Sequence, residues 1–64
     1  MTSKEYYKKK FEEMLATEKK ARNLYKHYVD RLEDAYLKNT MEKICNDEER
    51  HMGIVQSFID IASQ

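Results

Sequence analysis

Three polar side chains lie at positions where the heptad pattern of this chain calls for apolar ones. Glu48 and His51 form a Glu-x-x-His step, and Glu18 lies thirty residues upstream. Carboxylates and an imidazole are costly inside a helical core unless a partner compensates for their lost hydration. Because carboxylate oxygens and imidazole nitrogens together suit divalent transition metals, these three residues are candidate metal ligands.

The ligands interrupt two apolar seams, in which residues recur at spacings of four and three. The seam of the first half comprises Tyr7, Phe11, Met14, Glu18, Ala21, Tyr25, Tyr28 and Leu32. The seam of the second half comprises Leu37, Met41, Ile44, Glu48, His51, Val55, Phe58 and Ala62. Such a repeat is typical of helices that pack side by side. We therefore expect both seams to face a helical core.

The composition favours helices and shows no strand-type alternation. Proline is absent, and Gly53 is the only glycine. Thr2 or Ser3 can cap a first helix, and Asp34 can cap a second helix that begins at Ala35. We predict an all-α fold in a single domain, residues 1–64, with helices at about 4–32 and 35–62.

One continuous helix of about sixty residues, in a long coiled coil, is the alternative architecture. The heptad register argues against it, because the step from Leu32 to Leu37 is five residues long. A turn between two antiparallel helices explains this break without strain. We therefore expect a helical hairpin.

The length of the chain implies that the hairpin needs support. Below ~70–80 residues a single core rarely supplies enough stability without disulfides, metal or self-association. Cys45 is the only cysteine, which excludes a disulfide within the chain and favours a reducing compartment. Metal binding and self-association are therefore the expected supports.

Charge and hydropathy narrow the possible partners. Twelve basic and twelve acidic residues cancel and are interleaved, so we expect no nucleic-acid partner. No apolar run approaches the ~18 residues of a membrane span, and no signal peptide opens the sequence. The default expectation is a soluble cytoplasmic protein without membrane contact.

The candidate ligands should lie at one height in the hairpin. If the turn centres near Glu33, Glu18 lies fifteen residues before it and Glu48 fifteen after it. At ~1.5 Å per residue, both are roughly 22 Å from the turn, with His51 on the same helix face as Glu48. Carboxylate-bridged di-metal bundles need this set twice, so a homodimer would form a complete site in a four-helix bundle. The ligands lie near mid-helix, so a two-fold axis there joins both half-sites even in antiparallel hairpins.

The sequence resembles the ferritin-like superfamily, and most closely its two-helix branch, the encapsulated ferritins. The first-helix pattern Glu-x-x-Ala-x-x-x-Tyr corresponds to Glu18, Ala21 and Tyr25, and the pattern acidic-Glu-x-x-His corresponds to Asp47-Glu48-Glu49-Arg50-His51. The separation of the two glutamates is also similar to that of the encapsulated ferritins. In that branch, two chains build one di-iron ferroxidase centre.

The resemblance implies a ferroxidase that oxidises Fe(II) to Fe(III) for iron storage or detoxification, with Mn or Zn as surrogate metals. It implies Glu18, Glu48 and His51 as catalytic metal ligands. Tyr25 either hydrogen-bonds a ligand carboxylate or packs in the core. It also implies rings of dimers, such as a decamer, which the off-seam residues Leu24, Ile54 and Ile61 would favour.

Encapsulated ferritins act inside an encapsulin nanocompartment, to which a peptide beyond the second helix directs them. This sequence stops at Gln64, so either it is trimmed or the protein belongs to a differently packaged branch. Three other interpretations remain open. The cluster could be a structural or sensing Zn or Mn site without turnover, the chain could be a metal-free helical interaction module, or it could be a fragment of a longer four-helix protein.

Overall fold

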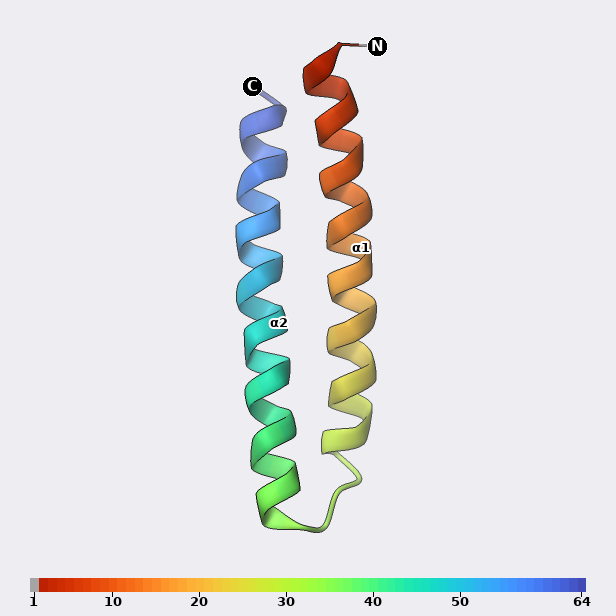
Figure 1. Cartoon of the computed structure of the whole chain (residues 1–64), viewed down its shortest axis with the longest axis vertical. Coiled ribbons are helices and arrows are strands. Elements are labelled where there is room, and N and C mark those ends of the chain that lie inside the picture. The colour runs from red at the N-terminus through yellow and green to blue at the C-terminus, as the bar shows by residue number, and fades with distance from the viewer. Residues whose placement is uncertain (1) are drawn as a thin grey trace.

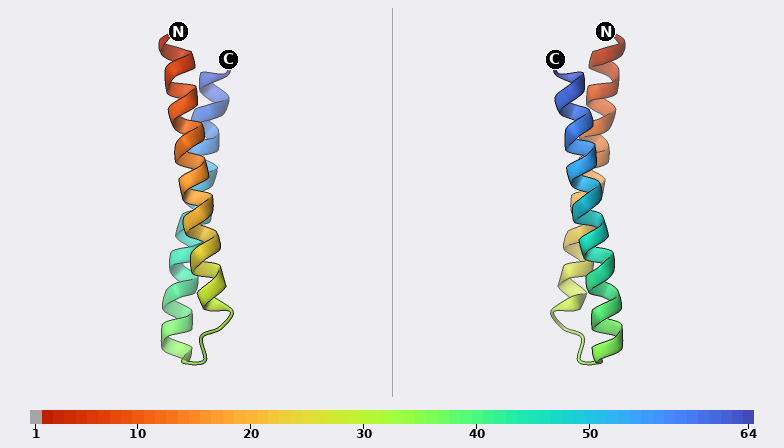
Figure 2. Two further views of the ribbon diagram at one scale, coloured as in Figure 1. Left: turned by 90° about the vertical axis from the view of Figure 1, so that its right-hand side faces the viewer. Right: turned by 90° about the vertical axis from the view of Figure 1, so that its left-hand side faces the viewer.

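Two long helices packed against each other form the whole of the described structure. A computed structural model of the chain, described over residues 2–64, contains α1 (Ser3–Val29) and α2 (Ala35–Ala62) and, within those residues, no strand. The helices run antiparallel, with the turn at one end and both termini at the other (Figure 1). In side view they cross at a shallow angle (Figure 2), as helices with heptad seams do. The predicted all-α hairpin is confirmed, and the single long helix is excluded.

Side-chain caps fix where both helices begin. The Thr2 hydroxyl accepts a hydrogen bond from the Glu5 backbone N–H at 3.1 Å, and the Glu5 carboxylate accepts one from the Thr2 N–H at 3.2 Å. The Asp34 carboxylate accepts a hydrogen bond from the Leu37 N–H at 2.8 Å. These bonds satisfy backbone donors that the first helical turn leaves free. The predicted cap at Asp34 and the predicted start at Ala35 are therefore correct.

The first helix ends at Val29, three residues earlier than expected. The N–H groups of Arg31 and Leu32 still donate to the Tyr28 carbonyl, each at 3.0 Å. The Arg31 guanidinium donates to the His27 carbonyl at 2.9 Å. Because these bonds satisfy the last carbonyls, the helix ends without a left-handed residue. Apolar periodicity continues to Leu32, so the sequence pattern did not reveal the earlier end.

The two helices meet along a seam that only half matches the predicted one. The least exposed seam positions are Phe11, Leu15, Glu18, Ala21, Arg22, Tyr25 and Val29 on α1, Leu32 in the turn, and Met41, Cys45, Glu48, Met52, Val55, Ile59 and Ala62 on α2. The other predicted seam residues are exposed, namely Tyr7, Met14, Tyr28, Leu37, Ile44, His51 and Phe58. Apolar residues occur as neighbouring pairs, such as Met14 with Leu15, and the periodicity could not select which member faces the other helix.

The displaced residues form a surface that we call the apolar side: Tyr7, Met14, Tyr28, Leu37, Ile44 and Phe58. Their exposed fractions run from 37% for Ile44 to 55% for Tyr7. Several of them directly precede a seam residue in the sequence, so their side chains are rotated away from the seam by the same angle about each helix. Because the two helices run antiparallel, these equal rotations bring both sets of side chains to the same side of the hairpin. The Phe11 and Phe58 rings lie 5.3 Å apart and join the two helices at the edge of this surface.

The opposite surface is polar. Arg22 on α1 and Glu49 on α2 form an ion pair across the helices at 3.5 Å. Beside it lies a shallow groove whose lining includes Lys26, Asp30 and Glu42. We call this surface the polar side, and its mixed charges are those of a solvated helix face.

A single hairpin buries little. Among residues 2–64, only Val29, Cys45 and Ile59 are buried, and no side chain there has a relative exposure below 2%. The radius of gyration is 14.9 Å, whereas a compact chain of this length would have about 11 Å. The accessible surface is 5065 Å², against about 4,400 Å² for a compact protein of the same mass. Between residues 2 and 64, neither helix is long and apolar enough to cross a membrane.

Candidate metal centre

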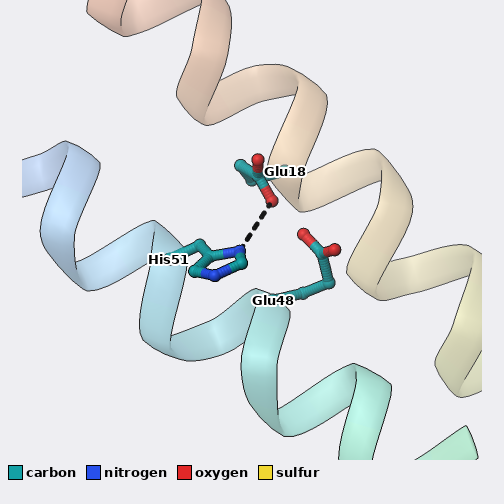
Figure 3. Close-up of side chains that lie close together, drawn as sticks. All are labelled: Glu18, Glu48 and His51. Atoms are coloured by element: carbon teal, nitrogen blue, oxygen red, sulfur yellow. Dashed lines mark ion pairs between the residues drawn. The ribbon is translucent and has the colours of Figure 1, made fainter.

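The structure brings the three predicted ligands together at the middle of the hairpin. Glu18 extends from α1, and Glu48 and His51 extend from successive turns of α2 (Figure 3). One ligand atom of each residue lies within 4.8 Å of the ligand atoms of the other two. The equal distances of Glu18 and Glu48 from the turn therefore do place them side by side, as the sequence predicted.

The distances are close to those of a coordination sphere. The Nδ1 atom of His51 lies 3.9 Å from the Oε2 atom of Glu18. Two ligands at about 2.0–2.2 Å from one ion can be at most about 4.2–4.4 Å apart. The His51–Glu18 pair already satisfies this limit.

The Glu48 carboxylate has one oxygen without a hydrogen-bond partner. Its Oε2 atom is buried and accepts no hydrogen bond from the described residues. Hydrogen bonding with the Glu18 side chain, then desolvation, then repulsion from the charge of Glu18 raise the pKa of Glu48, and the charge of His51 opposes this shift. An orphaned carboxylate beside a second one is the arrangement that a bound cation would relieve.

The cluster opens towards the apolar side. The Glu18 side chain is 29% exposed and the His51 side chain is 46% exposed. A shallow pocket beside Glu18 is lined by Lys10, Glu13, Met14 and Thr17 as well. One chain therefore offers two carboxylates and one imidazole from one side and leaves the other side of the site uncovered.

Tyr25 lies on the same face of α1 as Glu18, two turns away, and is partly buried. Over residues 2–64 its hydroxyl donates no hydrogen bond to Glu18 or Glu48, and Glu48 keeps its unpartnered oxygen. The hydrogen bond from Tyr25 to a ligand carboxylate stays a prediction, and in the single chain the residue packs in the seam.

Sequence reasoning missed one contact at the level of the cluster, the Arg22–Glu49 ion pair. Arg22 lies one turn from Glu18, and Glu49 is the neighbour of Glu48, so the pair connects the two helices directly behind the ligands. The sequence does contain a pattern that indicates this contact, because Arg22 follows Glu18 by four residues and therefore lies on the same face of the helix.

Comparison with models of known protein families, with curated proteins and with solved structures finds no match to this chain. The likeness to the encapsulated ferritins therefore depends on the motif residues and their geometry alone.

Proposed function

We propose that this chain is a ferroxidase that oxidises Fe(II) at a di-iron carboxylate site formed between two copies. The observation that carries the proposal is the convergence of Glu18, Glu48 and His51 beside an orphaned carboxylate oxygen. Carboxylates with one imidazole suit Fe(II), for which a set of soft thiolates would be less typical. Cys45, the single thiol, lies buried outside the cluster.

The need for a second copy follows from the count of ligands. Bundles that hold two iron or manganese ions use four carboxylates and two imidazoles, and one hairpin supplies half of these. The open side of the cluster adjoins the exposed residue Met14, which lines the same pocket as Glu18, and the exposed residues Ile44 and Phe58 lie seven residues before and after His51. Covering this surface with a second hairpin would remove apolar area from water and complete the set of ligands in one step.

The protein residues bind and orient the substrate ions in this proposal. Four ionised carboxylates would balance the charge of two Fe(II) ions, and a bound cation would favour the ionised form of Glu48, whose pKa is raised in the metal-free chain. Each Fe(II) gives up one electron, and two ions thus reduce one O2, which leaves with two protons as hydrogen peroxide. One carboxylate oxygen of Glu48, Oε2, is already shielded from water in the single chain.

The oxidised iron would leave the site, because a bundle of four helices has no cavity for a mineral. We therefore propose storage or detoxification in association with a separate compartment, such as an encapsulin shell. Rings larger than a dimer are compatible with the exposed residues Leu24, Ile54 and Ile61, whose exposed fractions are 54%, 43% and 60%.

The direct test mixes the Fe(II)-loaded protein with O2 in a stopped-flow spectrometer and follows Fe(III) absorbance. We expect saturable oxidation with two iron ions per pair of chains. Glu48→Gln should slow it more than about tenfold, since even loss of a group that only orients a ligand costs that much. The matched control is Glu42→Gln, an exposed glutamate of the same helix. Equal rates in the two variants would overturn the proposal.

A structural or sensing Zn site is the second candidate, because two carboxylates and one imidazole are also a Zn ligand set. Under that function, Zn(II) would bind and raise the melting temperature, while Fe(II) oxidation would not exceed the rate in protein-free buffer. The same Glu48→Gln and Glu42→Gln pair, titrated with Zn(II), separates this candidate from a metal-free interaction module.

A further inference from the structure

Met14 is a sulfur-bearing side chain beside the ligand cluster, on the apolar side of the hairpin. It lines the same shallow pocket as Glu18, which it precedes by four residues on one face of α1. Met14 is 50% exposed. Its thioether therefore lies where small molecules reach or leave the open side of the cluster, at which the Glu18 and His51 side chains also contact solvent.

The other sulfur atoms that the structure describes are shielded from solvent. Met41 and Met52 are partly buried in the seam, and Cys45 is buried. Burial, and then the charge of Glu49, raise the pKa of the Cys45 thiol, so this thiol stays protonated at neutral pH. Oxidants attack the thiolate form of cysteine, whereas a thioether needs no deprotonation. Exposure and chemistry therefore both favour Met14 as the sulfur that an oxidant reaches first.

We propose that hydrogen peroxide formed at the cluster oxidises the Met14 thioether to methionine sulfoxide, and that this sulfoxide weakens the pairing of two chains. The modification rests on the proposed function, because the reduction of O2 by two Fe(II) ions supplies the peroxide. One peroxide oxidises one thioether, so the sulfoxide accumulates over repeated cycles of iron oxidation.

The oxidation is balanced without a further reactant. The sulfur atom of Met14 donates an electron pair to one peroxide oxygen, an S–O bond forms, and the O–O bond breaks. The second oxygen leaves as water with both peroxide protons. The sulfur is thereby oxidised by two electrons, and the peroxide is reduced by two. Peroxide released into the pocket beside Glu18 is most concentrated there, which favours Met14 over the sulfur atoms of the seam.

The sulfoxide changes the surface that a second chain covers in the proposed site. Oxidation converts the apolar side chain of Met14 into a polar one. A polar group that is buried without a hydrogen-bond partner opposes association, so each oxidised chain pairs less well. Because the site needs ligands from two chains, iron oxidation slows as the sulfoxide accumulates. The modification thus limits how much peroxide one assembly produces.

The first test treats the metal-free protein with dilute hydrogen peroxide and maps the oxidised peptides by mass spectrometry. Sulfoxide should form several-fold faster at Met14 than at Met41 or Met52, because Met14 is exposed and the other two are partly buried. Equal rates at the three positions would overturn the proposal. This sample contains no iron, so its result does not depend on the ferroxidase reaction.

The second test adds Fe(II) in repeated small portions to the aerobic protein, with catalase present to remove peroxide from bulk solution. Sulfoxide at Met14 should increase with each portion, and Met52 should be oxidised several-fold less. The matched variants are Met14→Leu and Met52→Leu, which both retain an apolar side chain of similar volume. Native mass spectrometry should show the share of dimer falling in the wild type and in Met52→Leu, but not in Met14→Leu.

The outcomes separate this modification from the proposed function. Fe(II) oxidation without sulfoxide at Met14 contradicts the modification and leaves the ferroxidase standing. Fe(II) oxidation no faster than in protein-free buffer contradicts the ferroxidase, and with it the source of the peroxide. Sulfoxide at Met14 with an unchanged share of dimer, or an equal loss of dimer in Met14→Leu, contradicts the effect on pairing.

Discussion

The two sides of this hairpin are formed by the same two helices but expose different kinds of residue to solvent. On the polar side, Arg22 and Glu49 pair across the helices and the remaining charges are hydrated. On the apolar side, Ile44, Phe58 and their neighbours are exposed, and the ligand cluster opens among them. We propose that assembly covers the apolar side, whereas the polar side stays in solvent. The candidate metal site opens on the apolar side.

The largest expected effect is a charge placed on the apolar side. Ile44→Asp should weaken the dimer by about a hundredfold or more, because a buried unpaired carboxylate costs several kcal/mol. Sedimentation velocity in the presence of Fe(II) under anaerobic conditions measures the change. Asn46→Asp, two residues away on the exposed surface of the same helix, is the control and should leave the dimer intact. Equal effects of both substitutions would mean that the two sides do not differ.

The next effect concerns the cluster in the metal-free protein. Glu48→Gln should raise the melting temperature by a few degrees at neutral pH, because it removes repulsion between Glu48 and Glu18. The raised pKa of Glu48 means that the folded chain holds more protons than the unfolded one between the ordinary and the raised pKa. Metal-free wild-type stability should therefore fall as pH rises through that window, and the variant should lack this slope.

The measurement for Glu48→Gln is thermal unfolding by circular dichroism in chelator across the acidic to neutral range. Glu42→Gln should follow the wild-type profile, since Glu42 lies outside the cluster. If the wild-type stability instead increases over this window in chelator, the two carboxylates do not repel in the folded chain.

A third prediction tests whether the outer face of α2 is free. A Cβ added at Gly53 would meet no atom within 4 Å, and alanine is the better helix former. Gly53→Ala should therefore stabilise the chain by about 0.5–1 kcal/mol in urea unfolding. Destabilisation of the assembled protein would show that another chain approaches closely at this glycine. The surface that assembly covers would then include the outer face of α2.

The smallest expected effect is loss of the ion pair on the polar side. Glu49→Gln should cost no more than about 1 kcal/mol, because the side chains of Arg22 and Glu49 are 27% and 53% exposed. A double-mutant cycle with Arg22→Gln, read by urea unfolding, isolates the pair. A much larger coupling energy would show that this side is also buried in the assembly.

The fold was predictable to within a few residues because its signals are local. Asp34 caps α2 through its own side chain, and the absence of proline and of strand alternation left helix as the one regular structure. The end of α1 was missed because the hydrogen bonds to the Tyr28 carbonyl and the guanidinium of Arg31 replace a glycine signal there. The choice between Met14 and Leu15 as the seam residue was missed because both are apolar and adjacent.

The sequence by itself determined that Glu18 and Glu48 meet. Their equal separation from the turn depends only on the fixed rise of a helix, and His51 follows on the same face. Only the tertiary structure decided how the seam rotates, because that rotation depends on which neighbouring side chains interdigitate. The rotation leaves Glu48 with a buried unpartnered oxygen and turns His51 and the apolar side outward. The cluster is thus fixed by helix geometry, and its open face is fixed by packing.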